Sequence, residues 1–202
     1  MPSYSSNIII VNSRNKIIKK SFKLHIDLPT YRMLYCTFVR PLLEFAAPVW
    51  NPHHQKDIDK LEKVQRRATK LAPGLKKFEY AKRLKILDLT SLFERRIRGD
   101  LIQMYKICKG FDKVIWYSPF KFNNNESNTR GHTFKFNRDN FNINFRYNFF
   151  INRISNAWNN LPTEILNTNN VDIFKEKLDG IFKRYGTYNL NSTGKLEFQR
   201  SL

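Results

Sequence analysis

Five basic side chains between residues 56 and 70 have the spacing of a site that could bind a polyanion. They recur every three or four residues, as Lys56, Lys60, Lys63, Arg67 and Lys70. On a helix this spacing would place all of them in one narrow cationic stripe. The opposite face would be apolar and would carry Ile58, Leu61, Val64, Ala68 and Leu71. A row of phosphates along the stripe would relieve the repulsion between its charges. The alternative is the solvated outer face of an ordinary helix, which a charge run taken alone favours.

More basic residues surround the cationic stripe along the sequence. The segment 55–110 contains sixteen Lys or Arg and seven Asp or Glu, a net charge of +9. We therefore expect phosphate contacts, which give position rather than sequence specificity, from a wider group as well. Its further members are Arg66, Arg95, Arg96 and Arg98.

The composition of the whole chain favours the same class of partner. The chain has 202 residues, a formal net charge of +19 and a pI near 10.1. Such a charge points to RNA or DNA, with an anionic membrane surface as the rival. No apolar run is long enough to span a bilayer, and Ile8 to Val11 is too short for a signal-peptide core. Two cysteines suggest a reducing compartment. We expect an intracellular protein, nuclear or cytoplasmic, that is not secreted and has no membrane partner.

The sequence offers no arrangement typical of catalysis. It contains no adjacent pair of aspartates, no Gly-rich phosphate loop and no Ser-His-Asp order. Asp57 and Asp59 would point in different directions on a helix and would favour its N-terminal dipole. The remaining candidates lack zinc-ligand spacing; they are Cys36, His53, His54, Cys108 and His132. We therefore predict no catalytic residue, no metal and no cofactor, with both cysteines in the core.

The basic segment must be positioned by the helices on either side of it. Thr30 to Ala47 reads as a helix that Pro41 should kink or restart. Its predicted buried face holds Tyr31, Leu34, Tyr35, Phe38, Leu42 and Phe45, widened by Cys36, Val39 and Leu43. The basic helix should stop at Pro73-Gly74. A short helix from Phe78 to Leu87 follows. A capping box at Ser91 and Glu94 should then open a helix that ends near Gly110.

The pattern of apolar and polar residues changes after residue 112. Lys113 to Gly131 lacks helical period and reads as a linker. Apolar residues then alternate with polar ones from Phe134 to Phe149, which predicts a β-hairpin turning through 137–140. The helical period returns from Phe150 to Leu161, and Asp172 should cap a last helix.

The aromatic residues of the predicted hairpin admit two interpretations. Phe141, Phe145, Tyr147 and Phe149 could form a platform on which unpaired bases stack. The alternative, which we favour, is that they pack against neighbouring helices, because this region needs an apolar face to form a core. Trp50 and Trp158 are expected to be core anchors for the same reason.

These patterns predict a mainly α chain with one small α+β module. The predicted order is a mobile N-terminus (1–16), a helical bundle (17–112), a linker (113–131), an α+β module with one β-hairpin (132–184) and a disordered tail (185–202).

Several of these segments together resemble one region of a known family, in the same order and at similar spacing. They are Phe38 to Ala46, Val49 to Pro52, Asp57 to Leu71, Ser91 to Ile102, Met104 to Ile107, Phe149 to Arg153, Trp158 to Pro162 and Phe174 to Asp179. The family is the reverse transcriptases of non-LTR (LINE-type, jockey-like) retrotransposons, and the region follows the polymerase palm. The resemblance runs from about Ile17 to Leu178.

The resemblance implies that the bundle corresponds to the polymerase thumb, which lies against the backbone of the template-product duplex. None of the family's catalytic aspartates can be assigned to this sequence, so we expect a non-catalytic, truncated C-terminal fragment of an RNA-directed DNA polymerase. Two alternatives stay open. The apolar faces could pack on a palm or on a second copy of the chain. The chain could also be a decayed copy without function.

Overall fold

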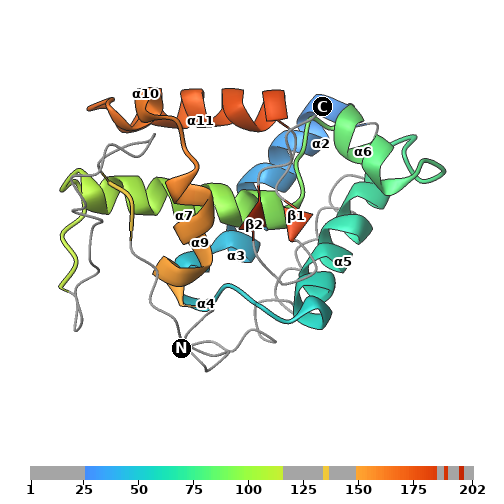
Figure 1. The fold of residues 1–202 in the computed structure, drawn as a ribbon. Coiled ribbons are helices and arrows are strands. Elements are labelled where there is room, and N and C mark those ends of the chain that lie inside the picture. Colours follow the sequence, from blue (N-terminus) through green and yellow to red (C-terminus); the bar gives the residue numbers. More distant parts are fainter. Residues whose placement is uncertain (1–25, 116–133, 137–148, 186–188, 191–195, 198–202) are drawn as a thin grey trace. The chain divides into compact units, whose positions relative to one another are not determined.

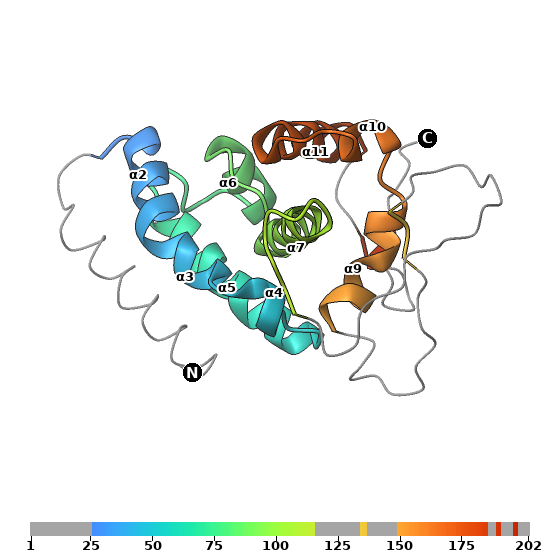
Figure 2. The same cartoon turned by 90° about the vertical axis from the view of Figure 1, so that its left-hand side faces the viewer.

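The described part of the chain is mainly helical, as the sequence predicts (Figures 1 and 2). The structure is a computed structural model, and it describes residues 26–115, 134–136, 149–185, 189–190 and 196–197. The predicted mobile N-terminus and most of the predicted linker lie outside these ranges. The chain divides into two compact units, residues 1–96 and 97–202. This division falls within helix α7 (Leu92–Cys108), whereas the sequence pattern placed it at the linker.

Pro41 interrupts the regular α-helix of the first helical segment, as expected, and the interruption is a π-helical turn. The segment comprises α2 (Leu28–Leu34), a single π-helical turn η1 (Tyr35–Val39) and α3 (Arg40–Glu44). The backbone N–H of Arg40 bonds to the Tyr35 carbonyl, five residues back. Proline lacks an N–H, and its ring crowds the carbonyl four residues before it. The wider π turn accommodates this defect without ending the helix.

The π turn also moves the buried face of this segment away from the predicted one. The side chains at every fourth residue from Tyr31 to Leu43 are buried; they are Tyr31, Tyr35, Val39 and Leu43. Phe38 is 49% exposed and Phe45 is 67% exposed, so the prediction that both face the core was wrong. The extra residue in the turn, which contains Phe38, advances the helical phase there. Phe45 is exposed for a different reason, because α3 ends at Glu44, before the predicted end at Ala47, and Phe45 has a non-helical backbone (φ -55°, ψ 127°).

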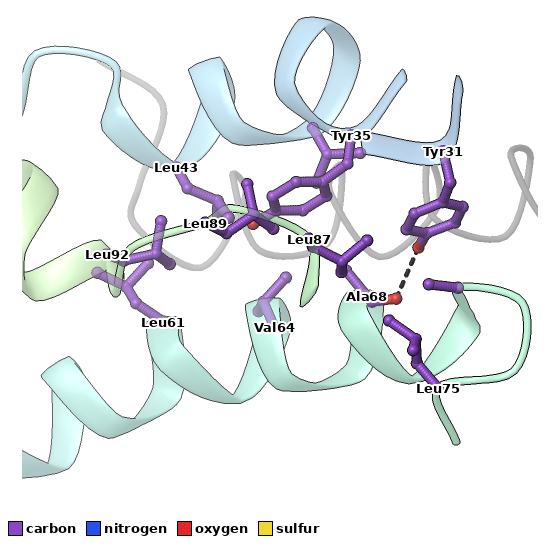
Figure 3. Close-up of a cluster of buried hydrophobic side chains, with 12 residues drawn as sticks. Tyr31, Tyr35, Leu43, Leu61, Val64, Ala68, Leu75, Leu87, Leu89 and Leu92 are labelled. Carbon is purple, nitrogen blue, oxygen red and sulfur yellow. Dashed lines mark hydrogen bonds between the residues drawn. The ribbon is translucent and has the colours of Figure 1, made fainter. Parts of the chain in front are cut away.

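Helix α5 (Gln55–Leu71) is the central element of the first unit and follows the short helix α4 (Ala47–Trp50). Figure 3 shows the buried side chains of α5 pointing toward those of the Pro41 segment. The α5 side chains in this core are Leu61, Val64 and Ala68. The hydroxyl of Tyr31 donates a hydrogen bond of 2.6 Å to the Ala68 carbonyl, which ties the two segments together (Figure 3).

The ends of the following helices agree with the sequence signals. Helix α5 ends at Leu71, and Gly74 has a φ of 71°, a conformation that suits glycine. Helix α6 (Tyr80–Ile86) follows. The capping box at the start of α7 is confirmed, because the Ser91 N–H bonds to Glu94 Oε2 at 3.0 Å and the Glu94 N–H bonds to Ser91 Oγ at 3.2 Å.

The second unit contains the remainder of α7 with α9 (Phe150–Asn159), α10 (Thr163–Leu166) and α11 (Val171–Tyr185). The Tyr105 ring stacks on Phe174 with the ring centroids 4.0 Å apart. Trp158 is fully buried, and its Nε1 donates to the Phe134 carbonyl at 2.8 Å, which confirms it as a core anchor. Gly110 has a φ of 74°, and the N–H of the next residue, Phe111, bonds back to the Lys106 carbonyl, so α7 ends as predicted.

Three details of the second unit differ from the predictions or lie beyond them. The side chain of Asn170, not that of Asp172, caps α11, because Asn170 Oδ1 accepts the Asp172 N–H at 2.7 Å. The turn of the predicted β-hairpin lies outside the described residues. The segment predicted as a disordered tail contains one short antiparallel pair, β1 (Asn189–Leu190) with β2 (Leu196–Glu197).

Candidate nucleic-acid interface

The cationic stripe forms as predicted on the outer face of α5. All five of its side chains, Lys56, Lys60, Lys63, Arg67 and Lys70, are exposed. Ile58, Leu61, Val64 and Ala68 are buried on the opposite face, at 8% exposure or less. The apolar face therefore fixes the rotation of α5 about its axis, and that rotation presents the cations to solvent.

Carboxylates reduce the charge of the stripe only near its N-terminal end. Lys60 Nζ lies 2.9 Å from Asp57 Oδ1, and this contact lowers the pKa of the Asp57 carboxyl below its usual value. Asp59 lies two residues further on and accepts a hydrogen bond from Gln55. Among the described residues, no carboxylate is within ion-pair distance of Lys63, Arg67 or Lys70. The positive charge is therefore concentrated in the C-terminal half of α5.

The buried side of α5 carries a polar network that holds the helix against its neighbours. The Tyr35 hydroxyl donates to Gln65 Oε1 at 2.7 Å. Gln65 Nε2 in turn donates to the Tyr80 hydroxyl at 3.0 Å and to the Thr90 carbonyl at 2.9 Å. The Tyr80 hydroxyl donates to Glu62. Burial raises the pKa of both tyrosines well above 10, so both remain hydrogen-bond donors at neutral pH.

A buried arginine joins the end of α5 to α6. Arg83 is 3% exposed, and its guanidinium donates to the Phe78 carbonyl at 2.6 Å and to Thr69 Oγ1 at 3.1 Å. Arg66, which the sequence assigned to the interface, is exposed, and its guanidinium carbon lies 4.9 Å from the centre of the Tyr80 ring. Arg66 can therefore reach a phosphate, while Arg83 has a structural role.

The structure argues against phosphate contacts by the three arginines of α7. Arg96 is 2% exposed and cannot reach a ligand in solvent. In the first unit, Arg95 makes two hydrogen bonds to Glu44, of 2.7 and 2.9 Å. In the second unit, Arg98 makes two to Asp179, of 2.6 and 2.8 Å. Such bidentate pairs occupy the donors that a phosphate would need.

Four further cations lie directly after α5, and the sequence prediction did not include them in the site. They are Lys76, Lys77, Lys82 and Lys85, and all four are exposed. From Lys63 to Lys85 the chain holds nine Lys or Arg and a single acid, Glu79. This high density of basic residues is visible in the sequence. A helical period does not reveal it, because the run crosses a loop and a short helix.

The titratable groups near the interface do not suggest metal binding or nucleophilic chemistry. No group of three potential metal ligands occurs within the described ranges. His53 and His54 are exposed in front of α5, and burial and the neighbouring His54 lower the pKa of His53. Cys36 and Cys108 are partly buried free thiols, and burial raises the pKa of Cys108 to about 12. That thiol stays protonated at neutral pH and is a poor nucleophile.

Three of the four residues of the predicted aromatic platform are not among the described residues. Phe141, Phe145 and Tyr147 lie outside the described residues. Phe149 is described, directly precedes α9 and is 55% exposed. Trp50 is half-buried against the core of the first unit and donates its Nε1 hydrogen to the Phe45 carbonyl.

None of the described helices is long and apolar enough to cross a membrane. Comparisons of the chain with known protein families, with curated proteins and with solved structures gave no match.

Proposed function

We propose that this chain binds the sugar-phosphate backbone of an RNA or DNA duplex, without reading its sequence, through the exposed cations of α5. The single observation that supports this most is the arrangement of Lys63, Arg67 and Lys70. These three side chains are exposed on one face, and no described carboxylate is within ion-pair distance of them.

The dimensions of the stripe suit a nucleic-acid strand. From residue 56 to residue 70 the stripe spans roughly 20 Å at about 1.5 Å per residue. Phosphates of one strand follow one another at about 3.4 Å along a duplex axis, so several fall within reach. Long Lys and Arg side chains on a rigid helix can follow such a row without contacting base edges.

The role in the cell that we propose follows from the sequence resemblance. In a polymerase thumb, a helix of this kind would steady the template-product duplex of RNA-directed DNA synthesis. We propose no catalytic step for this chain itself, because the sequence contains no adjacent pair of aspartates to hold two metal ions.

A titration of the chain with two unrelated labelled duplexes, over a series of salt concentrations, tests the proposed binding. Backbone binding predicts equal affinities for the two sequences and a steep loss of affinity with salt. An affinity that differs strongly between the sequences, or that salt does not change, would contradict it.

A second candidate function is docking on another protein surface, such as a polymerase palm or a second copy of this chain. Its support is the exposure of Met33 (60%), Phe45 (67%) and Val49 (76%) along α2 to α4. Gel filtration in high salt distinguishes the two functions. A species that remains oligomeric there favours docking through apolar surface, whereas charge-driven complexes dissociate.

A further inference from the structure

Phe78 is an exposed aromatic residue within the dense run of cations that follows α5. It is 38% exposed. Lys76 and Lys77 precede it and are exposed. The ammonium group of Lys82, one helical turn on, lies 4.4 Å from the centre of the Phe78 ring.

The backbone that carries Phe78 is held at several points. The Phe78 N–H donates to the Leu75 carbonyl at 3.1 Å, and Leu75 itself is only 3% exposed. The Phe78 carbonyl accepts the 2.6 Å hydrogen bond from buried Arg83. The ring is therefore presented on a fixed turn, so that little conformational entropy is lost when a ligand stacks on it.

The combination of an aromatic ring with several cations fits one ligand chemistry best. Aromatic side chains in a positively charged surface bind single-stranded nucleic acid by stacking on a base while the cations neutralise its phosphates. A base inside a duplex has both faces covered, so an aromatic side chain can stack only on an unpaired or terminal base. Glu79 is the single carboxylate in the run and lies at the start of α6.

We propose that Phe78, with Lys76, Lys77 and Lys82, forms a stacking site for an unpaired base of a nucleic-acid strand. This site rests on the proposed function, because its residues directly follow α5 in the same run of cations along the chain. It adds a preference that α5 alone does not give, namely for a single-stranded extension over a blunt duplex.

The test compares two strands with the same phosphates, a short oligo(dT) and an abasic oligomer of equal length, by fluorescence anisotropy on the full chain. Phe78→Leu should lower the affinity for oligo(dT) by about 5- to 100-fold and leave the affinity for the abasic strand unchanged. Phe78→Trp should preserve the affinity for oligo(dT). The matched control is Phe45→Leu, an equally conservative change of an exposed phenylalanine that lies beside Glu44, and it should change neither affinity.

The outcomes separate this site from the proposed function. If Lys63→Gln, Arg67→Gln and Lys70→Gln together weaken both strands while Phe78→Leu weakens neither, backbone binding stands and the stacking site is refuted. If a duplex binds but neither single strand does, the stacking site is refuted and backbone binding to a duplex stands. If the duplex does not bind either, the proposed function fails as well. If Phe78→Leu weakens binding to phosphatidylcholine–phosphatidylserine vesicles but not to oligo(dT), the surface binds anionic membranes and the stacking proposal is overturned.

Discussion

Glu62 on α5 accepts a hydrogen bond of 3.2 Å from the backbone N–H of Leu92, the first residue of α7. The same carboxylate accepts the hydrogen of the Tyr80 hydroxyl. Glu62 is 9% exposed and therefore lies on the buried side of the basic helix, where it joins α5 to the start of α7 and to α6. An anion at a helix N-terminus also interacts favourably with the helix dipole.

Glu62→Leu should lower the free energy of unfolding by about 2–4 kcal/mol, because it leaves two buried donors without an acceptor. Urea unfolding followed by circular dichroism measures this change. Asp59→Asn is the control, since Asp59 is an exposed carboxylate on the same helix and its loss should cost less than about 0.5 kcal/mol. Equal effects of the two changes would show that the Glu62 contacts do not stabilise the unit.

The buried tyrosines predict a loss of stability at alkaline pH. Burial raises the pKa of Tyr31, Tyr35 and Tyr80 above the ordinary value of 10.0. Each hydroxyl keeps its proton in the folded chain, whereas in the unfolded chain it ionises near pH 10. The stability they contribute is therefore fully present below about pH 10 and declines above it, by up to about 1.4 kcal/mol per pH unit for each tyrosine.

Urea unfolding at a series of pH values from 8 upward, in steps of about one unit, measures this decline. Tyr31→Phe removes one of the ionisable groups. It should therefore reduce the slope of the free energy of unfolding against pH by up to about 1.4 kcal/mol per pH unit, the contribution of one proton. A stability that stays constant through pH 10 and above would contradict the buried, hydrogen-bonded positions of these hydroxyls.

The ion pairs of α7 predict that two of its arginines are dispensable for nucleic-acid binding. Arg95→Gln and Arg98→Gln each break a partly exposed bidentate pair and should cost about 1 kcal/mol of stability or less. Neither should change the affinity for a duplex by more than about twofold, while Arg67→Gln should weaken it clearly. A loss with Arg98→Gln as large as that with Arg67→Gln would show that the pair with Asp179 opens to bind phosphate.

The purified chain should show no DNA synthesis on a primed poly(A) template with Mg²⁺ or Mn²⁺. The reason is chemical, since two-metal catalysis needs closely placed carboxylates and the sequence holds no adjacent aspartates. Gel analysis of primer extension measures this, with a known reverse transcriptase as the positive control. Template-dependent extension by the chain alone would overturn the expectation.

The sequence predicted well those features that depend on neighbours within one or two helical turns. The two faces of α5, the capping box at Ser91 and the helix end at Gly110 all follow from local spacing, and the structure has all three. An interruption of the regular α-helix near Pro41 was also predictable. The exposure of Phe38 and Phe45 was not predictable, because a π turn shifts the helical phase at Phe38 and the helix ends at Glu44, before Phe45.

The sequence could not predict features that depend on contacts between distant residues. In the sequence, Arg95 and Arg98 look like the arginines of a nucleic-acid interface. Their partners, Glu44 and Asp179, lie 51 and 81 residues away in the sequence. No periodicity reveals such pairs. The burial of Arg83 could not be predicted from the sequence either. Its hydrogen-bond acceptors, Thr69 Oγ1 and the Phe78 carbonyl, come together only when the loop after α5 folds.

The proposed binding runs through the C-terminal half of α5 and does not depend on net charge alone. The direct test is the dependence of duplex affinity on salt for two variants of equal charge. One carries Lys63→Gln, Arg67→Gln and Lys70→Gln. The control carries Lys175→Gln, Lys177→Gln and Lys183→Gln, three changes on α11 in the second unit. Glutamine is a good helix former, so both helices should remain intact by circular dichroism.

We predict that the α5 variant lowers the slope of log K against log salt by about two to three units, equally on unrelated sequences. The α11 variant should retain the slope of the parent chain to within about half a unit. Two results would contradict this: the folded α5 variant keeps the slope of the parent chain, or the two variants lower the slope by the same amount. In either case the cationic stripe is only a solvated helix face, and binding does not run through the C-terminal half of α5.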